Sequence, residues 1–257
     1  MSDQDNMKDE NDFFVGYLDM PKKDRRFLLK AVPLGLLGVA GAGLGLGMSA
    51  PSKPGGRWET GTPVTLTGRI GFHPYPVLWT GGKAIVLSGV AKKSADAYLR
   101  PFDGQVVEVS GIKITRKDCF MLGVADGDIK TSSQTAPLLP QTEVIGEVSL
   151  MGEILDAQCF MGIMTPGYGR SHRGCATLCI RGGLPVYFSA GVGEHKNAND
   201  PTHCGGIGYL LANSNGEKIN MEILDHIAVP LTITARHEKI GSLERLVYKS
   251  GSLKRLI

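Results

Sequence analysis

The sequence predicts a mainly β protein in which one N-terminal transmembrane helix precedes two small β-barrel units, the second carrying a helical insertion. Three observations predict this: an uncharged stretch at residues 31–50, runs of alternating apolar and polar residues, and an internal repeat. The composition agrees, because 35 glycines, 14 prolines and only 7% aromatic residues are typical of short strands joined by turns.

The first predicted element combines a basic segment with an apolar one. Residues 22–30 read KKDRRFLLK, and residues 31–50 contain no charged side chain. An apolar stretch of about 20 residues is long enough to cross the hydrocarbon core of a bilayer as a helix. We therefore predict a cytoplasmic tail over residues 1–30 and a transmembrane anchor over residues 31–50.

The basic segment resembles a bacterial twin-arginine export signal. Arg25 and Arg26 are followed by Phe-Leu-Leu-Lys, and six glycines dilute the apolar stretch. The resemblance implies export of the folded protein across the inner (cytoplasmic) membrane. Pro51 follows a weak small-x-small cleavage site, so we expect the signal to be kept as a single-pass anchor. The positive-inside rule then places the bulk of the chain in the periplasm.

Alternating runs predict the strands of a first β unit over residues 62–130. The clearest runs are residues 64–70, 84–87 and 105–114. Residues 131–144 are polar and contain prolines, which predicts a linker. A second β unit is predicted over residues 145–257.

The two predicted units share a short repeat. Val64–Ile70 and Val148–Ile154 both read V-[TS]-L-x-G-x-I, and residues 106–109 align with residues 230–233. The pattern indicates an internal duplication, with chance similarity between two β-rich segments as the alternative. A first strand interrupted by glycine resembles OB-like folds, in which glycine lets that strand bend around the barrel. We therefore expect two OB-like domains, the second enlarged by an insertion at residues 159–206.

Four of the five cysteines lie in this insertion, three of them close to a histidine. The spacing is C-x12-H-x2-C-x3-C, formed by Cys159, His172, Cys175 and Cys179. A helix over residues 172–181 would place His172, Cys175 and Cys179 on one face. Cys159 would then complete a Cys3His set, which suits zinc, copper or iron.

The surroundings of these residues refine the prediction. Ser171 is a suitable cap for the start of the helix, and Gly182 and Gly183 are a strong stop signal. His203 and Cys204, in a long polar loop, are candidate additional ligands.

The C-x3-C pair resembles the cysteine pair of copper centres and copper chaperones in respiratory chains. One alternative to a metal is a disulfide, because an oxidising compartment favours one and Cys159 could reach Cys175 or Cys179. The other alternative is a set of free buried thiols. Export in the folded state favours a metal or redox cofactor, since the cofactor could be inserted beforehand in a reducing cytoplasm. Cys119 stands alone, and we expect a small buried thiol there.

Few features indicate catalysis. No Ser-His-Asp pattern, phosphate loop or dinucleotide fingerprint is found in the sequence, so an enzyme is not the favoured prediction. The nearby carboxylates are Glu153, Asp156 and Glu194, and the sequence does not pair them. The net charge of +3, without a long basic run beyond the signal, does not suggest nucleic-acid binding.

Together these features predict a membrane-anchored periplasmic accessory or electron-transfer subunit of a respiratory or photosynthetic complex. Its expected partners are the membrane and other integral membrane or periplasmic subunits. In organisation the chain resembles Rieske-type subunits, which also keep a twin-arginine anchor, although its ligand motif differs from theirs. The alternatives are a structural subunit or assembly factor with disulfides and no metal, and an enzyme or metallochaperone.

Overall fold

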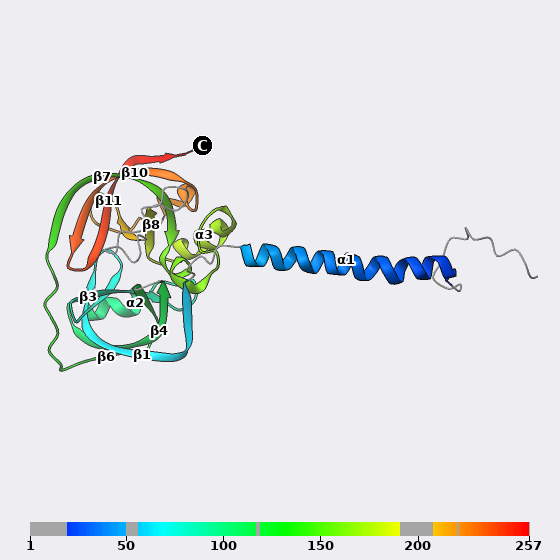
Figure 1. The fold of residues 1–257 in the computed structure, drawn as a ribbon. Helices are drawn as coiled ribbons and strands as arrows, with labels where there is room; N and C mark the ends of the chain where they lie inside the picture. The colour runs from blue at the N-terminus through cyan, green and yellow to red at the C-terminus, as the bar shows by residue number, and fades with distance from the viewer. Residues whose placement is uncertain (1–19, 50–55, 117–118, 191–207, 220, 257) are drawn as a thin grey trace, which may run out of the picture. The chain divides into compact units, whose positions relative to one another are not determined.

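The computed structural model describes most of the chain (Figure 1). The described ranges are residues 20–49, 56–116, 119–190, 208–219 and 221–256. They belong to two units, which we describe separately: an N-terminal unit up to Lys53, and a unit from Pro54 to Ile257 that we call the β unit.

The N-terminal unit contains one long helix, α1 (Lys22–Ser49). By length and composition its segment Lys22–Leu46 could cross a membrane once, although a signal sequence passes the same test. The helix starts at Lys22 and not at residue 31 because the basic segment contains no residue that breaks a helix. Asp24 lies in the first turn, where a carboxylate interacts favourably with the helix dipole.

The first barrel of the β unit has five strands, with a sixth strand attached. The strands are β1 (Arg57–Phe72), β2 (Pro76–Thr80), β3 (Lys83–Gly89), β4 (Val106–Arg116), β5 (Cys119–Val124) and β6 (Ile129–Thr131). Their order is β1-β2-β3-β5-β4, and pairing of β1 with β4 closes the barrel. Strands β3 and β5 are parallel, whereas the other paired strands of this barrel are antiparallel.

The second barrel repeats this connectivity. Its strands are β7 (Thr142–Asp156), β8 (Val186–Ala190), β9 (Tyr209–Ala212), β10 (Leu231–Ile240) and β11 (Leu243–Arg255). Their order is β7-β8-β9-β11-β10, closed by β7 and β10, and the parallel pair is β9 with β11. The predicted fold class, two small OB-like barrels after a long apolar helix, is therefore confirmed.

The glycine of the sequence repeat occupies the same place in both barrels. A Cβ on Gly68 of β1 would lie 2.5 Å from the carbonyl oxygen of Trp79 in β2. A Cβ on Gly152 of β7 would lie 2.1 Å from the carbonyl oxygen of Ser189 in β8. In each copy only glycine allows the next strand to approach so closely while the long first strand bends. The aligned motifs thus lie on equivalent strands.

The strands extend beyond the ranges expected from alternation alone. The first begins at Arg57, which pairs with Thr115, and β7 begins at Thr142, which pairs with Ile240. The segment between β6 and β7 is therefore shorter than the expected linker. Backbone pairing, which the side-chain pattern does not report, sets these strand ends.

Short helical segments connect the strands. They are α2 (Asp96–Leu99), α3 (Arg173–Arg181), the 3-10 turns η1 (Arg100–Phe102), η3 (Arg170–His172) and η4 (Leu224–His226), and the π-helical turn η2 (Cys159–Ile163). The turns η2 and η3 and helix α3 all lie between β7 and β8, inside the predicted insertion.

The two barrels pack on each other through a shared core. One buried cluster fills the first barrel and includes Ile70, Leu87 and Leu122. The larger cluster fills the second barrel and also contains first-barrel side chains, among them Trp79 and Ile114. The barrels therefore form one compact body, whose interface carries the features described next.

Candidate metal centre

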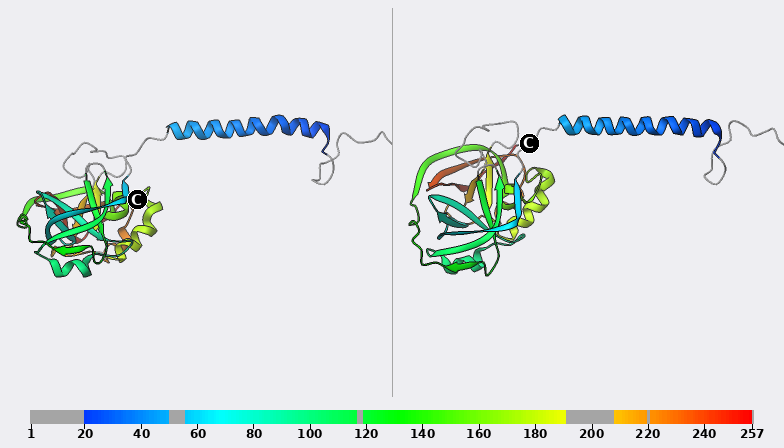
Figure 2. Two further views of the ribbon diagram at one scale, coloured as in Figure 1. Left: turned by 90° about the horizontal axis from the view of Figure 1, so that it is seen from below. Right: turned by 60° about the horizontal axis from the view of Figure 1, so that its bottom comes forward.

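In the structure the insertion leaves the second barrel where β7 ends at Asp156 and returns at Val186 in β8. It therefore ends earlier than the predicted insertion at residues 159–206, which includes β8. In the first barrel the equivalent connection, from β1 to β2, takes only the residues between Phe72 and Pro76. The yellow-green insertion lies along one side of the β unit in both views of Figure 2. The second barrel thus carries an extra segment that the first barrel lacks.

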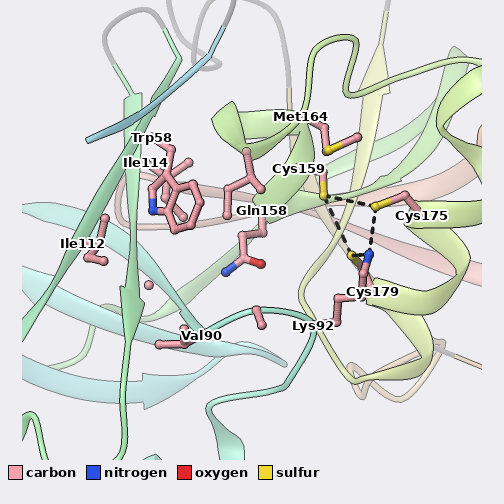
Figure 3. A pocket seen from close by; sticks show the side chains of 13 residues that line it. Trp58, Val90, Lys92, Ile112, Ile114, Gln158, Cys159, Met164, Cys175 and Cys179 are labelled. Atoms are coloured by element: carbon pink, nitrogen blue, oxygen red, sulfur yellow. Dashed lines mark hydrogen bonds between the residues drawn. The ribbon is translucent and has the colours of Figure 1, made fainter. Parts of the chain in front are cut away.

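The three cysteines of the insertion come together as free thiols (Figure 3). Cys159 lies in η2, whereas Cys175 and Cys179 lie one turn apart on α3. The sulfur of Cys159 is 3.8 Å from the sulfur of Cys175 and 3.8 Å from that of Cys179. These separations far exceed a disulfide bond length of about 2.05 Å.

His172 lies beside the sulfurs and is oriented by Asp156. Its Nε2 is 3.0 Å from Oδ2 of Asp156, and both side chains are fully buried. Because a carboxylate accepts hydrogen bonds, Nε2 is the donor, and in the neutral ring Nδ1 then keeps its lone pair. Nδ1 is buried and has no hydrogen-bond partner among the described residues. A buried nitrogen of this kind is suited to bind a metal.

The ligand atoms form two overlapping groups, each close enough to share an ion. Those of Cys159, His172 and Cys175 lie within 4.8 Å of one another, and the same limit holds for Asp156, Cys159 and Cys179. Each of these two groups could hold a metal ion, and Cys159 belongs to both. The four residues of the predicted Cys3His set are therefore neighbours, but His172 and Cys175 fall in one group and Cys179 in the other. His203 and Cys204, the candidate additional ligands, lie outside the described residues, as does Glu194.

The start of the helix differs from the prediction. The 3-10 turn η3 precedes α3, which begins at Arg173, and Ser171 makes no capping hydrogen bond. The backbone N–H of His172 donates to the carbonyl of Gly169, which closes the 3-10 turn. The end of the helix agrees, because Gly182 is its C-cap and Gly183 has a φ of 84°.

Asp156 is a functional residue whose role the sequence did not reveal. Its Oδ1 accepts a hydrogen bond of 2.8 Å from the backbone N–H of Cys159, and its Oδ2 accepts from His172. One buried carboxylate therefore positions two of the four candidate ligands. The available signal was its place three residues before Cys159, at the end of a predicted strand.

Lys92 is a second residue that the sequence did not indicate. Its Nζ lies 2.9 Å from the sulfur of Cys175 and 3.4 Å from that of Cys179. The hydrogen bond with Cys175 raises the pKa of Lys92 above its usual range, so that it stays charged. Hydrogen bonding from Cys159, together with the nearby Lys92 ammonium, lowers the pKa of Cys179 and favours its thiolate.

The loop that carries Lys92 approaches α3 closely because Gly182 has no side chain. The N–H of Ser94 donates to the carbonyl of Gly182 at 2.9 Å. A Cβ on Gly182 would lie only 1.7 Å from the carbonyl oxygen of Lys92. Lys92 and Cys175 are 83 positions apart in the sequence, so no local pattern predicts this contact.

Two other residues were named from the sequence. Cys119 differs from expectation, and Glu153 has a structural role. Cys119 on β5 is disulfide-bonded, so the expected free buried thiol is wrong at this position. A lone cysteine in a sequence does not reveal its partner. Glu153 accepts a hydrogen bond of 2.8 Å from the backbone N–H of Gly169, and its burial raises its pKa. It therefore anchors the insertion to β7.

No family model, no curated protein and no solved structure matches this chain. The functional assignment therefore depends on the geometry of the site.

Proposed function

We propose that this chain is a membrane-anchored subunit whose β unit holds one soft metal ion. Its ligands would be Cys159, His172, Cys175 and Cys179. The two distances from the sulfur of Cys159 carry this proposal, and binding would draw the sulfurs of Cys175 and Cys179 closer together. Sulfurs bound to one tetrahedral ion at about 2.3 Å lie about 3.8 Å apart. The sulfur of Cys159 lies at 3.8 Å from each of the other two.

The surroundings support a bound cation. Asp156 orients His172 through Nε2, as carboxylates do for metal-binding histidines. Three thiolates around a divalent ion leave one negative charge, which the ammonium of Lys92 would balance. Nζ of Lys92 already lies beside the sulfurs of Cys175 and Cys179, so it would donate hydrogen bonds to both thiolates when they bind the ion.

Most of the site is buried, and a full set of protein ligands favours a structural or electron-transfer role over hydrolysis. Cys159, Cys179 and His172 are buried, and four protein ligands fill a tetrahedral ion. Zinc, copper and iron all accept this donor set. Zinc would make the centre structural, whereas copper or iron would allow electron transfer.

The location completes the proposal. The apolar helix α1 and the twin-arginine motif at Arg25 and Arg26 support a single-pass protein of the inner membrane, with the β unit in the periplasm. Folded export suits a protein that receives its metal in the cytoplasm. We infer an accessory or electron-transfer subunit of a respiratory or photosynthetic complex, with other membrane or periplasmic subunits as partners.

Elemental analysis and thiol counting on the full chain, purified without oxygen, test this function. We expect one metal ion per chain, lost on Cys175→Ser or Cys179→Ser. Leu178→Ser is the matched control, because Leu178 is exposed on the same helix. Its metal content should stay at the wild-type value.

Two results would contradict the proposal. The first is an unchanged metal content in Cys175→Ser and Cys179→Ser. The second is a metal-free wild-type protein; if the thiols at Cys159, Cys175 and Cys179 were then partly unreactive, a structural subunit stapled by a disulfide would take its place.

A further inference from the structure

A cavity of about 240 Å³ borders the cysteine cluster on the side of the first barrel (Figure 3). Its walls are mainly apolar and come from both barrels. They include Trp58, Val90, Ile112, Ile114, Ile163 and Met164. The cluster sulfurs, Lys92 and Gln158 are the polar groups that also line it. The cavity therefore combines an apolar interior with a small polar end.

Gln158 presents a hydrogen-bond acceptor in this cavity. Its Nε2 donates to the carbonyl of Gly89 at 2.8 Å and to Oγ of Ser88 at 3.1 Å. Because the carbonyl of Gly89 can only accept, these bonds fix which end of the amide is the nitrogen. Oε1 is left as an acceptor, and no donor reaches it from the described part of the chain.

Lys92 presents a donor. An ammonium group has three N–H bonds, and two of them are directed at Cys175 and Cys179. One N–H is left for a further acceptor. The polar groups of the lining are thus one acceptor and one donor, and neutral hydroxyl groups can match both.

The size of the cavity suits one substituted ring. A protein cavity of about 150 Å³ lined by apolar side chains takes up benzene. At about 240 Å³, this cavity admits a ring with small substituents. A ligand that matches both Gln158 and Lys92 must donate one hydrogen bond and accept another.

We infer that the cavity binds a neutral single-ring hydroquinone. One hydroxyl donates to Oε1 of Gln158, and the other accepts from Nζ of Lys92. Quinols with lipid tails are concentrated in membranes, which suits a chain with a helix apolar enough to span one. The inference rests on the proposed function, because it assigns a ligand class to the surroundings of the metal site.

Gly123 offers a way to fill the cavity without disturbing its walls. A Cβ added there would lie 3.8 Å from both the carbonyl oxygen of Ile112 and Cδ1 of Ile114, and 3.9 Å from Nε2 of Gln158. These are ordinary van der Waals distances. Gly123→Val and Gly123→Phe should therefore occupy progressively more of the ligand volume. Gly61→Phe is the matched control, because a side chain on Gly61 of β1 meets no atom within 4 Å.

The experiment is equilibrium dialysis of methylhydroquinone and toluene, without oxygen, against the full chain in lipid nanodiscs. Binding to empty nanodiscs is subtracted. We expect saturable binding of methylhydroquinone that is about ten-fold tighter than that of toluene, because only the former makes the two hydrogen bonds. Gly123→Val should weaken binding, Gly123→Phe should abolish it, and Gly61→Phe should preserve it.

Absence of saturable binding, unchanged binding in Gly123→Phe, or toluene binding at least as tightly as methylhydroquinone would overturn the inference. If Gly123→Phe did not fold, Gly123→Val and the wild-type comparison of the two ligands would decide. Metal content is measured on the same samples. A protein that holds metal but does not bind methylhydroquinone refutes this inference alone, whereas a metal-free protein refutes the proposed function.

Discussion

At the scale of single residues, the candidate metal centre depends on one buried carboxylate. Asp156 accepts a hydrogen bond from the backbone N–H of Cys159 and another from Nε2 of His172. It therefore fixes both the turn that carries one sulfur and the tautomer of the imidazole. Positioning groups of this kind are worth about 10–100-fold in metal affinity.

We predict that Asp156→Asn lowers metal affinity by about 10–100-fold, because a neutral amide orients His172 less firmly and makes it a weaker base. Competition with a chelator of known affinity measures the change. Glu153→Gln is the control, since Glu153 is also buried on β7 but anchors Gly169 and not a ligand. Its affinity should stay within a few-fold of wild type. Equal losses in the two variants would assign Asp156 a general structural role instead.

The sequence predicted the four residues of the cluster better than the groups around them. The spacing of His172, Cys175 and Cys179 follows from helix geometry, so that local pattern was sufficient. The positions of Lys92 and Gln158 at the site depend on how two barrels pack, and no local spacing encodes that. Ser171 was misjudged as a cap because the backbone makes a 3-10 turn there, closed by the carbonyl of Gly169.

At the scale of elements, helix α3 connects the insertion to the first barrel. Its C-cap, Gly182, is bonded to the backbone of Ser94 and lies directly against Lys92. Another glycine of the same helix, Gly174, faces open space. Substitution of Gly174 changes helix propensity alone, whereas substitution of Gly182 also changes the contact with Lys92. Comparing the two therefore isolates the contribution of this contact to stability.

We predict opposite effects of the same substitution at these two positions. Gly182→Ala should lower the free energy of unfolding by about 1–3 kcal/mol, because its methyl group has no room beside the carbonyl of Lys92. Gly174→Ala should raise it by about 0.4–1 kcal/mol, since alanine restricts the unfolded chain and favours a helix. Urea denaturation of both variants at one fixed metal concentration provides the measurement. A stabilising Gly182→Ala would show that the loop and the helix do not touch as described.

Strands were predicted well where side chains alternate and less well where backbone pairing alone defines them. The motif at Val64–Ile70 and Val148–Ile154 identified equivalent strands, because its glycine must admit the next strand in each barrel. The ends at Arg57 and Thr142 were missed because their side chains are exposed and carry no pattern. The disulfide at Cys119 was missed because pairing of cysteines is a property of the folded chain.

At the scale of the whole molecule, the chain combines a helix that could cross a membrane with a body built from two similar barrels. Only the second barrel has gained a segment between its first two strands. The first barrel therefore shows what the second would be without its candidate metal centre. The barrel framework and the segment that carries the candidate metal centre are thus distinct parts of the structure.

We predict that the mature protein keeps residues 1–50, because Pro51 makes the preceding bond a poor substrate for a signal peptidase. The intact mass of protein extracted from membranes measures this. Replacing Arg25 and Arg26 by lysine should leave the β unit in the cytoplasm, whereas replacing Lys22 and Lys23 by arginine should not. A mature chain that begins at or near Pro51 would contradict the prediction of a retained anchor.

If the proposed site holds an ion, the contact of Lys92 with two sulfurs links metal occupancy to the packing of the barrels. All three candidate sulfur ligands belong to the second barrel, and the ammonium that contacts two of them belongs to the first. If an ion binds more tightly while Lys92 is in place, then by reciprocity the barrels dock more tightly while the ion is bound, and by the same factor. Loss of the ion would weaken the packing between the two barrels as well as removing a cofactor. The rigidity of the β unit would then depend on how much metal the protein holds.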